Sequence, residues 1–243
     1  MGLPVSKKEL DRLGDRLRDA AVPSEEDLRL WGLVRPHFLA SLEEVRTALA
    51  DLGLRPTARE KNRDTLVDKL RRERDMRLSR VQDVVGARVV IDTSLPGQDD
   101  WVARIAARFP DHRVRDRRRE PSHGYRAVHV VVRIDGIPVE IQVRTAWQDR
   151  WAQAMERLGD CWGRAIRYGG GPELPDRPES IRGRQARPRR EWVDLLLALH
   201  RDLAVLEEPG YGVPAAPGTG PAAPDLARLL DDFRTFTSQG PPP

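Results

Sequence analysis

The sequence has little that would mark a secreted or membrane protein. Cys161 is the only cysteine among 243 residues, so no disulfide can form within the chain. No apolar run approaches the ~20 residues that cross a bilayer, and no apolar stretch follows Lys7 and Lys8, as it would in a secretion signal. We therefore expect a cytoplasmic protein with no membrane partner.

Charge, in contrast, is abundant. Charged residues make up 33% of the chain and the formal net charge is +4, with arginine supplying most of the positive charge. Guanidinium groups bind phosphates bidentately and stack on bases, so a polyanionic ligand is a reasonable hypothesis. Arginine-rich composition also arises in genomes that favour arginine codons, so composition alone leaves both interpretations open.

Periodicity predicts helices at both ends of the chain and strands between them. Helical patterns cover 5–20, a helix that starts after Ser24, a further helix from Pro36 to about Leu52, the middle of 59–75, 99–109, 147–158, 191–206 and 225–236. β-Branched and apolar runs predict strands at 87–91, 125–134 and 137–143. The last two flank Asp135-Gly136, a strong type I′ hairpin signal. This order predicts an α+β fold, with a mixed β-sheet flanked by helices.

The same patterns predict the domain organisation. We expect N-terminal helices (1–53), a core (54–168), a basic Gly/Pro/Arg-rich linker or mobile flap (169–190), a C-terminal helix (191–207) and a mostly disordered tail (208–243).

The predicted hairpin gathers polar side chains on one face. With a two-residue loop at Asp135-Gly136, strand alternation gives this face Tyr125, His129, Glu140, Gln142 and Arg144. The opposite face carries Val128, Val130, Val132, Ile141 and Val143. A solvated sheet surface is the common alternative, but such surfaces mostly carry Lys, Glu and Thr. The mixture of ring, imidazole, carboxylate, amide and guanidinium predicts the floor of a ligand site.

Four sequence elements, in this order, resemble those of RelA/SpoT synthetase domains. Residues 59–69 (REKNRDTLVDK) resemble R-x-K-x-x-x-S-x-x-x-K, with Thr65 for Ser, and residues 83–88 (DVVGAR) resemble D-x-x-G-x-R. Residues 124–129 (GYRAVH) resemble G-Y-R-S-x-H, and residues 140–145 (EIQVRT) resemble E-I-Q-[IV]-R-T. The resemblance covers roughly 54–160. It implies a nucleotidyltransferase-like synthetase domain with helical N- and C-terminal extensions.

That family transfers the β,γ-pyrophosphate of ATP to the 3′-hydroxyl of a guanine nucleotide. The resemblance implies that Lys61, Thr65 and Lys69 hold the ATP phosphates, and that Arg59 and Arg88 sandwich the adenine. Lys61 and Lys69 are eight residues apart, about two helical turns, so a helix would place them on one face with Thr65 between them. A solvated helix face is the ordinary alternative for such a pair.

The resemblance also assigns the metal and the acceptor. It implies that Asp83 and Glu140 are catalytic and hold Mg²⁺, which takes few protein carboxylates and several phosphate oxygens. Glu140 would also help to deprotonate the attacking hydroxyl, and Tyr125 would stack on the acceptor base. The other implied acceptor contacts are Arg115, Arg117, His129, Gln142 and Arg144. Taken alone, Asp83 is more typical of a helix or turn cap, whereas the joint match of the four elements favours the functional interpretation.

One segment departs from the family. Where the acceptor loop usually carries Lys-Asp-Tyr and then Pro-Lys-x-Asn, residues 115–123 are one residue shorter, carry arginines for lysines and place His123 where Asn is common. Because base-edge hydrogen bonds set base discrimination, the acceptor stays open between GDP or GTP and, alternatively, an adenine nucleotide or the 3′ end of a tRNA. An RNA backbone would suit Arg182, Arg184, Arg187, Arg189 and Arg190, although an arginine-rich linker is the commoner explanation.

Taken together, the resemblance implies a small, synthetase-only GTP/GDP pyrophosphokinase that makes (p)ppGpp, the alarmone of the stringent response. Its partners would be ATP, GDP or GTP, and Mg²⁺, with tRNA as an alternative. We expect no hydrolase half, because the roughly 50 residues before the core carry no His-Asp hydrolase pattern. A homo-oligomer, such as a tetramer built on terminal helices, is a further expectation. A non-catalytic nucleotide-binding module is the third hypothesis, disfavoured because both metal carboxylates are present.

Overall fold

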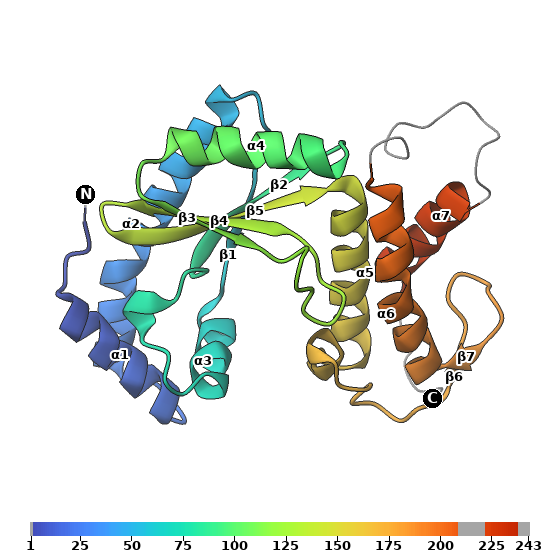
Figure 1. Cartoon of the computed structure of the whole chain (residues 1–243). Helices are drawn as coiled ribbons and strands as arrows, with labels where there is room; N and C mark the ends of the chain where they lie inside the picture. The colour runs from blue at the N-terminus through green and yellow to red at the C-terminus, as the bar shows by residue number, and fades with distance from the viewer. Residues whose placement is uncertain (1, 209–221, 238–243) are drawn as a thin grey trace. The chain divides into compact units, whose positions relative to one another are not determined.

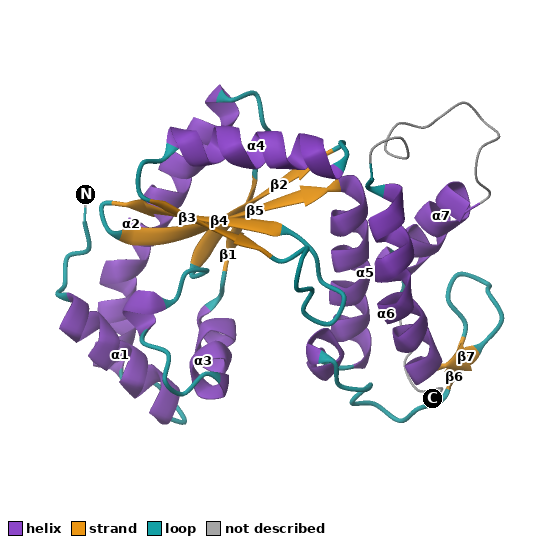
Figure 2. Cartoon of the chain, viewed as in Figure 1, coloured by secondary structure: helices purple, strands orange, loops and turns teal. Residues whose placement is uncertain are grey.

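The structure, a computed structural model, describes residues 2–208 and 222–237 (Figure 1). Its helices and strands confirm the predicted α+β class (Figure 2). The chain forms two compact units. The first comprises Met1–Val89, Trp101–Arg115 and His129–Val143, and the second comprises Val90–Asp100, Asp116–Val128 and Arg144–Pro243.

A five-stranded sheet organises the first unit. Its order is β1-β2-β5-β4-β3, with bounds β1 Thr57–Glu60, β2 Val85–Ile91, β3 His112–Asp116, β4 Val128–Ile134 and β5 Ile137–Thr145. The pair β1–β2 is antiparallel, whereas β2 and β5 run in the same direction in Figure 2. The sheet is therefore mixed, as the sequence predicts. The strands β1 and β3 were not predicted, because nearly all their side chains are exposed and show no apolar alternation.

The predicted hairpin joins β4 and β5. Asp135 and Gly136 have φ values of 50° and 83°, and positive φ at both central residues is what a type I′ turn requires. The valines and isoleucines predicted for the core face of the hairpin are at most 1% exposed. The polar residues of the alternate positions therefore belong to the other face.

Helices flank this sheet. The helices α1 (Lys7–Asp19), α2 (Glu25–Asp51), α3 (Arg63–Arg72) and the 3₁₀ helix η1 (Leu78–Arg80) belong to the first unit, and α4 (Leu95–Arg108) belongs to it from Trp101 onward. In Figure 1, α3 and α4 lie on opposite sides of the sheet. One helix, α2, replaces the two predicted before and after Pro36. Proline removes one hydrogen bond of the helix, but the helix continues because Val34, Phe38 and Leu42 bury a common apolar face on both sides of it.

Three α-helices build the second unit: α5 (Ala146–Trp162), α6 (Arg189–Leu206) and α7 (Ala222–Arg234). Thr145 begins α5 with a capping box, in which its hydroxyl accepts from Gln148 N and the Gln148 side chain binds back. The core of the unit combines aliphatic side chains with buried aromatic rings, and Trp192 meets Phe233 edge to face with ring centroids 5.7 Å apart.

The segment 169–190, predicted as a linker or mobile flap, packs into this unit. It contains β6 (Pro178–Glu179) and β7 (Arg187–Pro188), and follows the 3₁₀ helix η2 (Arg164–Tyr168). Ile181 is fully buried, and Glu179 forms a buried ion pair with Arg189 at 2.7 Å. Within the predicted tail 208–243, α7 confirms the expected short helix, whereas 209–221 and 238–243 lie outside the described residues.

Across residues 2–208 and 222–237, every helix is too short or too polar to cross a membrane.

Candidate active site

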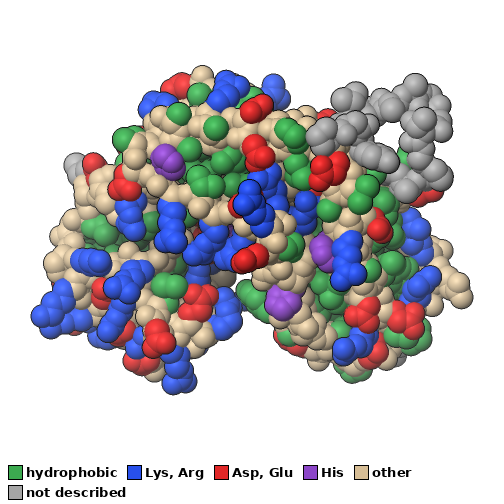
Figure 3. All heavy atoms as spheres, viewed as in Figure 1, with side chains coloured by type: hydrophobic (Ala, Val, Ile, Leu, Met, Phe, Trp, Pro, Cys, Tyr) green, Lys and Arg blue, Asp and Glu red, His purple; other side chains and the backbone are tan. Residues whose placement is uncertain are grey.

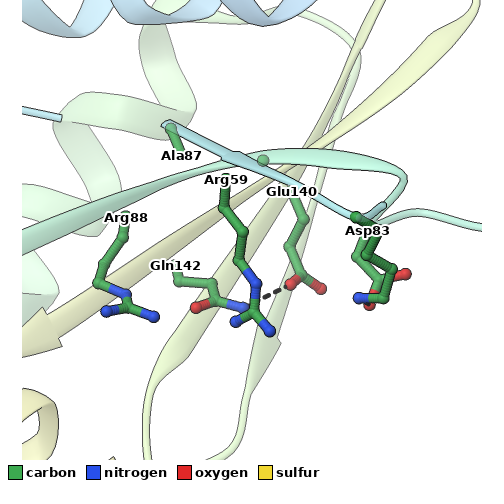
Figure 4. A pocket seen from close by; sticks show the side chains of 8 residues that line it. Arg59, Asp83, Ala87, Arg88, Glu140 and Gln142 are labelled. Carbon is green, nitrogen blue, oxygen red and sulfur yellow. Dashed lines mark hydrogen bonds and ion pairs between the residues drawn. The ribbon is translucent and has the colours of Figure 1, made fainter. Parts of the chain in front are cut away.

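A pocket on the polar face of the sheet brings together most of the residues predicted to bind ATP and metal. All its lining residues belong to the first unit: Arg59, Lys61, Asp83, Gly86, Ala87, Arg88, Glu140 and Gln142. Figure 4 shows the side chains of Arg59, Arg88, Gln142 and Glu140 projecting to the same side of the sheet. Basic side chains are also spread, among acidic ones, over the face seen in Figure 3, so it is this convergence, and not surface charge, that locates the site.

Strand pairing explains how two distant arginines come to line the pocket. Arg59 on β1 pairs with Gly86 on β2, and Thr57 pairs with Arg88. Paired residues share a face, and so do alternate residues of one strand, so Arg59 and Arg88 project together. Gly86 also permits β2 to approach β5, since a Cβ there would lie 2.6 Å from the backbone oxygen of Glu140.

Asp83 lines the pocket and lies between two lysines. Lys61 Nζ is 2.6 Å from one carboxylate oxygen of Asp83 and Lys69 Nζ is 2.8 Å from the other. Burial opposes ionisation, but the charges of Lys61 and Lys69 outweigh it and lower the pKa of Asp83 to about 2. Asp83 is therefore ionised at neutral pH and is held by two of the three side chains predicted to bind phosphate, Lys61 and Lys69.

The two lysines reach Asp83 by different routes, which corrects the prediction that they share a helix face. Asn62 caps α3, and the helix begins at Arg63. Lys61 thus precedes the helix, and its backbone N–H donates to Val84 O at 3.0 Å as an extension of β1. Only Thr65 and Lys69 belong to α3. The Thr65 hydroxyl donates to the Asn62 side chain at 2.6 Å, so Thr65 helps to fix the start of the helix.

Glu140 lies on β5 with hydrogen-bonding neighbours on both sides. His129 Nδ1 is 3.1 Å from Glu140 Oε2, and Gln142 Nε2 donates to Glu140 Oε1 at 2.9 Å (Figure 4). Burial raises the pKa of Glu140, but the hydrogen bond and charge of His129 outweigh this and lower it, while Asp83 contributes a smaller upward shift. The contacts show that these three polar side chains of the predicted face meet.

Arg115 lies on the same face as His129. Two backbone hydrogen bonds fix the register of β3 against β4, from Arg133 N to Asp111 O at 3.0 Å and from Arg117 N to Ala127 O at 2.9 Å. In an antiparallel pair this register sets Arg115 opposite His129, and opposed residues share a face. The exposed Arg115 side chain therefore extends the polar face toward the edge of the sheet. For Arg117, the structure gives only this backbone role.

Tyr125 and Arg144 meet in the second unit. Arg144 Nη2 donates to the Tyr125 hydroxyl at 3.2 Å, and its guanidinium carbon lies 5.2 Å from the centre of the tyrosine ring. Arg144 Nη1 also donates to Asp149 Oδ1 at 2.9 Å. The Arg144 side chain is only 1% exposed, so here it supports Tyr125, whereas the sequence predicts that it contacts the acceptor. Sequence reasoning missed Asp149, because an acidic residue in the first turn of a helix is commonplace.

The donor set near Asp83 and Glu140 fits magnesium but forms no complete metal cage. Within the described part of the chain, no group of three or more His, Cys, Asp or Glu side chains is arranged to hold a metal. Asp83 and Glu140 instead contribute two carboxylates to one pocket. Mg²⁺ is commonly held by one or two carboxylates together with phosphate oxygens and water, so this pair suits a metal that arrives with a polyphosphate.

Comparison with solved structures identifies proteins that share this fold. Small alarmone synthetase 1 of Bacillus subtilis has a TM-score of 0.51 at 20% sequence identity, covering 70% of this chain and 88% of that chain. Small alarmone synthetase 2 of the same organism has a TM-score of 0.52 at 18% identity, covering 70% and 90%. The chain therefore has the fold of small alarmone synthetases.

The sequence comparison then gives the family. Residues 58–157 match the region found in RelA/SpoT proteins, and the predicted site residues all lie inside that range. Residues 58–157 of this chain therefore form a RelA/SpoT-type region. The uncharacterized protein Rv1366 of Mycobacterium tuberculosis (strain ATCC 25618 / H37Rv) is 38% identical over 177 residues, as is the uncharacterized protein Mb1401 of Mycobacterium bovis. The match covers 70% of this chain, which spans only 64% of the length of these relatives.

Proposed function

We propose that this protein is a pyrophosphokinase that transfers the β,γ-pyrophosphate of ATP to the 3′-hydroxyl of GDP or GTP. The observation that carries the proposal is the convergence of Lys61 and Lys69 on Asp83 in a pocket that also contains Glu140 and two arginines. A structure of small alarmone synthetase 1 bound to its product pppGpp shares the fold, with a TM-score of 0.52 at 21% identity, covering 70% of this chain and 89% of that one.

The pocket supplies the charge that such a transfer needs. Phosphoryl-type transfers depend mainly on positioning and on neutralising phosphate oxygens. Lys61 and Lys69 would exchange the Asp83 carboxylate for ATP phosphates, and Arg59 and Arg88 would hold the adenine between their guanidinium planes. The freed Asp83 and Glu140 would hold Mg²⁺, which neutralises the phosphate charge when it is bound.

The reaction conserves charge and atoms without a further reactant. The acceptor 3′-oxygen forms a bond to the β-phosphorus of ATP, the bond from that phosphorus to the α,β-bridging oxygen breaks, and AMP leaves. The proton of the hydroxyl passes to the Glu140 carboxylate, which the Gln142 amide orients at 2.9 Å. Tyr125 would stack on the acceptor base, while Arg115 and His129 would face its phosphates.

The structure removes one argument for a tRNA acceptor. Within the basic stretch that would suit an RNA backbone, Arg184 pairs with Asp232 at 2.7 Å and Arg189 is buried against Glu179. Arg182 donates to the Thr235 hydroxyl at 3.2 Å. These guanidinium groups hold the second unit together, so tRNA is retained as an arm of the experiment and is not proposed as the acceptor.

Radiolabel transfer tests the proposal directly. The purified protein is incubated with γ-³²P-ATP and Mg²⁺ and offered GDP, GTP, AMP, ADP or bulk tRNA separately. We expect label on GDP or GTP, lost in Glu140→Gln and kept in the control Glu44→Gln, whose side chain is exposed on α2. Label on tRNA or on an adenine nucleotide alone would overturn the guanine acceptor. A folded protein that labels none of them would overturn the pyrophosphokinase itself.

A further inference from the structure

A buried carboxylate ends the C-terminal helix α6. Glu207 is the C-cap residue of α6 and is 1% exposed. A negative charge at this end of a helix is opposed by the helix dipole, and burying it carries a desolvation cost. Burial raises the pKa of Glu207, and the charge of Arg126 opposes that rise. A residue placed against two unfavourable effects requires compensation from its surroundings.

The compensation comes from two of the sequence elements shared with RelA/SpoT proteins. Arg126 Nη1 donates to Glu207 Oε2, and the Thr145 hydroxyl donates to Glu207 Oε1. The backbone oxygen of Glu207 accepts from Leu95 N at 2.9 Å, so the start of α4 is attached at the same point. All four residues belong to the second unit. Glu207 thus binds together three segments that are far apart in the sequence.

The residues held by Glu207 are direct neighbours of Tyr125 and Arg144. Arg126 follows Tyr125, and Thr145 follows Arg144. On the other side of Tyr125, Gly124 lies against Trp151 so closely that a Cβ would be 2.7 Å from the indole. Tyr125 is therefore fixed from both flanks: Gly124 packs on α5, and Arg126 is tied to the end of α6.

We propose that Glu207 is a positioning residue for the acceptor nucleotide, acting through Arg126 and Thr145 on Tyr125 and Arg144. The inference rests on the proposed pyrophosphokinase function. It assigns Arg126 to an internal ion pair and gives the end of α6, which lies outside residues 58–157, a part in acceptor binding. ATP binding is not expected to depend on this link, because the pocket around Asp83 lies in the first unit.

The test compares acceptor and ATP kinetics in Glu207→Gln with those in Glu208→Gln, whose side chain is exposed at the next position. In Glu207→Gln we expect the KM for GDP or GTP to rise roughly tenfold, the effect of ~1.4 kcal/mol. We expect the KM for ATP to stay within about twofold. Glu208→Gln is expected to match the wild type. Equal rises in both KM values, or an unchanged acceptor KM, would overturn the proposal.

A mutant cycle distinguishes positioning from general loss of structure. Arg126→Gln and the double variant Arg126→Gln/Glu207→Gln break the same link, so the rises in acceptor KM are expected to be non-additive. Thermal melting by circular dichroism identifies which variants are folded. If Glu207→Gln does not fold, the double variant, which carries no unpaired buried charge at this link, takes its place. A wild-type acceptor KM in the folded double variant would overturn the proposal. A wild-type protein inert toward every acceptor would overturn the proposed function and this inference with it.

Discussion

Replacing Asp83 by asparagine keeps the size of the side chain but removes the charge that Lys61 and Lys69 share. In the folded protein the two Nζ atoms are 2.6 and 2.8 Å from the carboxylate. The variant would leave both ammonium groups facing a neutral amide in a partly buried pocket. Each lysine is less than one-fifth exposed, at 12% and 17%, so water compensates for the lost charge only in part.

The size of the effect follows from the pKa of Asp83. Folding lowers it from 3.8 to about 2, and each unit corresponds to about 1.4 kcal/mol. The side chain is 23% exposed, and solvent screening reduces the figure, so we expect Asp83→Asn to lower the free energy of unfolding by about 2 kcal/mol at pH 7.

The pH dependence has a definite sign. A carboxylate whose pKa falls on folding stabilises the protein above its unfolded pKa and loses that effect as the pH falls through its folded pKa. The difference between the wild type and Asp83→Asn should thus be constant from pH 7 to about pH 5 and shrink between about pH 4 and pH 2. Urea unfolding, followed by circular dichroism at pH 7, 5, 4 and 3, measures it.

The exposed Asp100 on α4 provides the matched control, because Asp100→Asn removes the same charge without these lysine partners. Asp100→Asn should change the free energy of unfolding by less than about 0.5 kcal/mol, as is usual for surface substitutions. If Asp83→Asn is as stable as the wild type at pH 7, or if its deficit is the same at pH 7 and pH 3, the electrostatic account of this cluster is wrong.

Two further substitutions test the geometry on either side of the chemistry. Gly86→Ala would press a Cβ against the Glu140 backbone. We expect this variant to lose about 1–3 kcal/mol of unfolding free energy and its pyrophosphate transfer. The control Gly32→Ala, which has open space around it, should stabilise α2 by about 0.5–1 kcal/mol. Wild-type melting and activity in Gly86→Ala would contradict this. In Arg144→Lys, the lysine lacks the planar fork with which Arg144 contacts both Tyr125 and Asp149. Steady-state kinetics should therefore show a higher KM for the acceptor and an unchanged KM for ATP. A higher KM for ATP with an unchanged KM for the acceptor would contradict the assignment of Arg144 to the support of Tyr125.

The hairpin was predictable because its determinants are local. Asp135-Gly136 encodes the turn, and alternation along the two strands encodes both the buried face and the polar face. From this pattern the sequence also locates Glu140 and Gln142 on one surface with His129, and their contacts agree. A period of two is a property of the strand itself, so no knowledge of the rest of the fold was needed.

The edge strands and the lysine arrangement were not predictable in the same way. The four residues of β1 are all exposed, so its pairing with β2 leaves no apolar signature. The spacing of Lys61 and Lys69 suggested a helix, but the Asn62 side chain accepts from Thr65 N at 2.8 Å and caps a helix that begins at Arg63, two residues after Lys61. When a side chain accepts a hydrogen bond as a helix cap, the helix begins after that residue and does not extend to the residues before it. The convergence on Asp83, 22 and 14 residues away, is tertiary.

Glu207 shows the limit of sequence reasoning most clearly. Its side-chain partners are 81 and 62 residues away, and by local rules a glutamate after an apolar helix indicates an exposed end. Sequence reasoning also fails for Glu179 and Arg189. The Gly/Pro/Arg-rich composition of 169–190 predicts that they belong to an exposed linker, but both residues are buried. In each case a charged residue is retained in the interior because another segment carries its counter-charge, and composition does not record which segment that is.

The charges of the pocket also constrain how the proposed reaction would begin. In the described structure, Asp83 holds both Lys61 and Lys69, so ATP phosphates must compete with a carboxylate for the same ammonium groups. Asp83 would be a ligand of the divalent cation, whose charge would replace that of the ammonium groups beside the carboxylate, so Lys61 and Lys69 would be left to the phosphate oxygens. Under the proposed function these ion pairs would favour ATP that carries its metal over ATP alone, and in the described structure they compensate the charges of the two partly buried lysines.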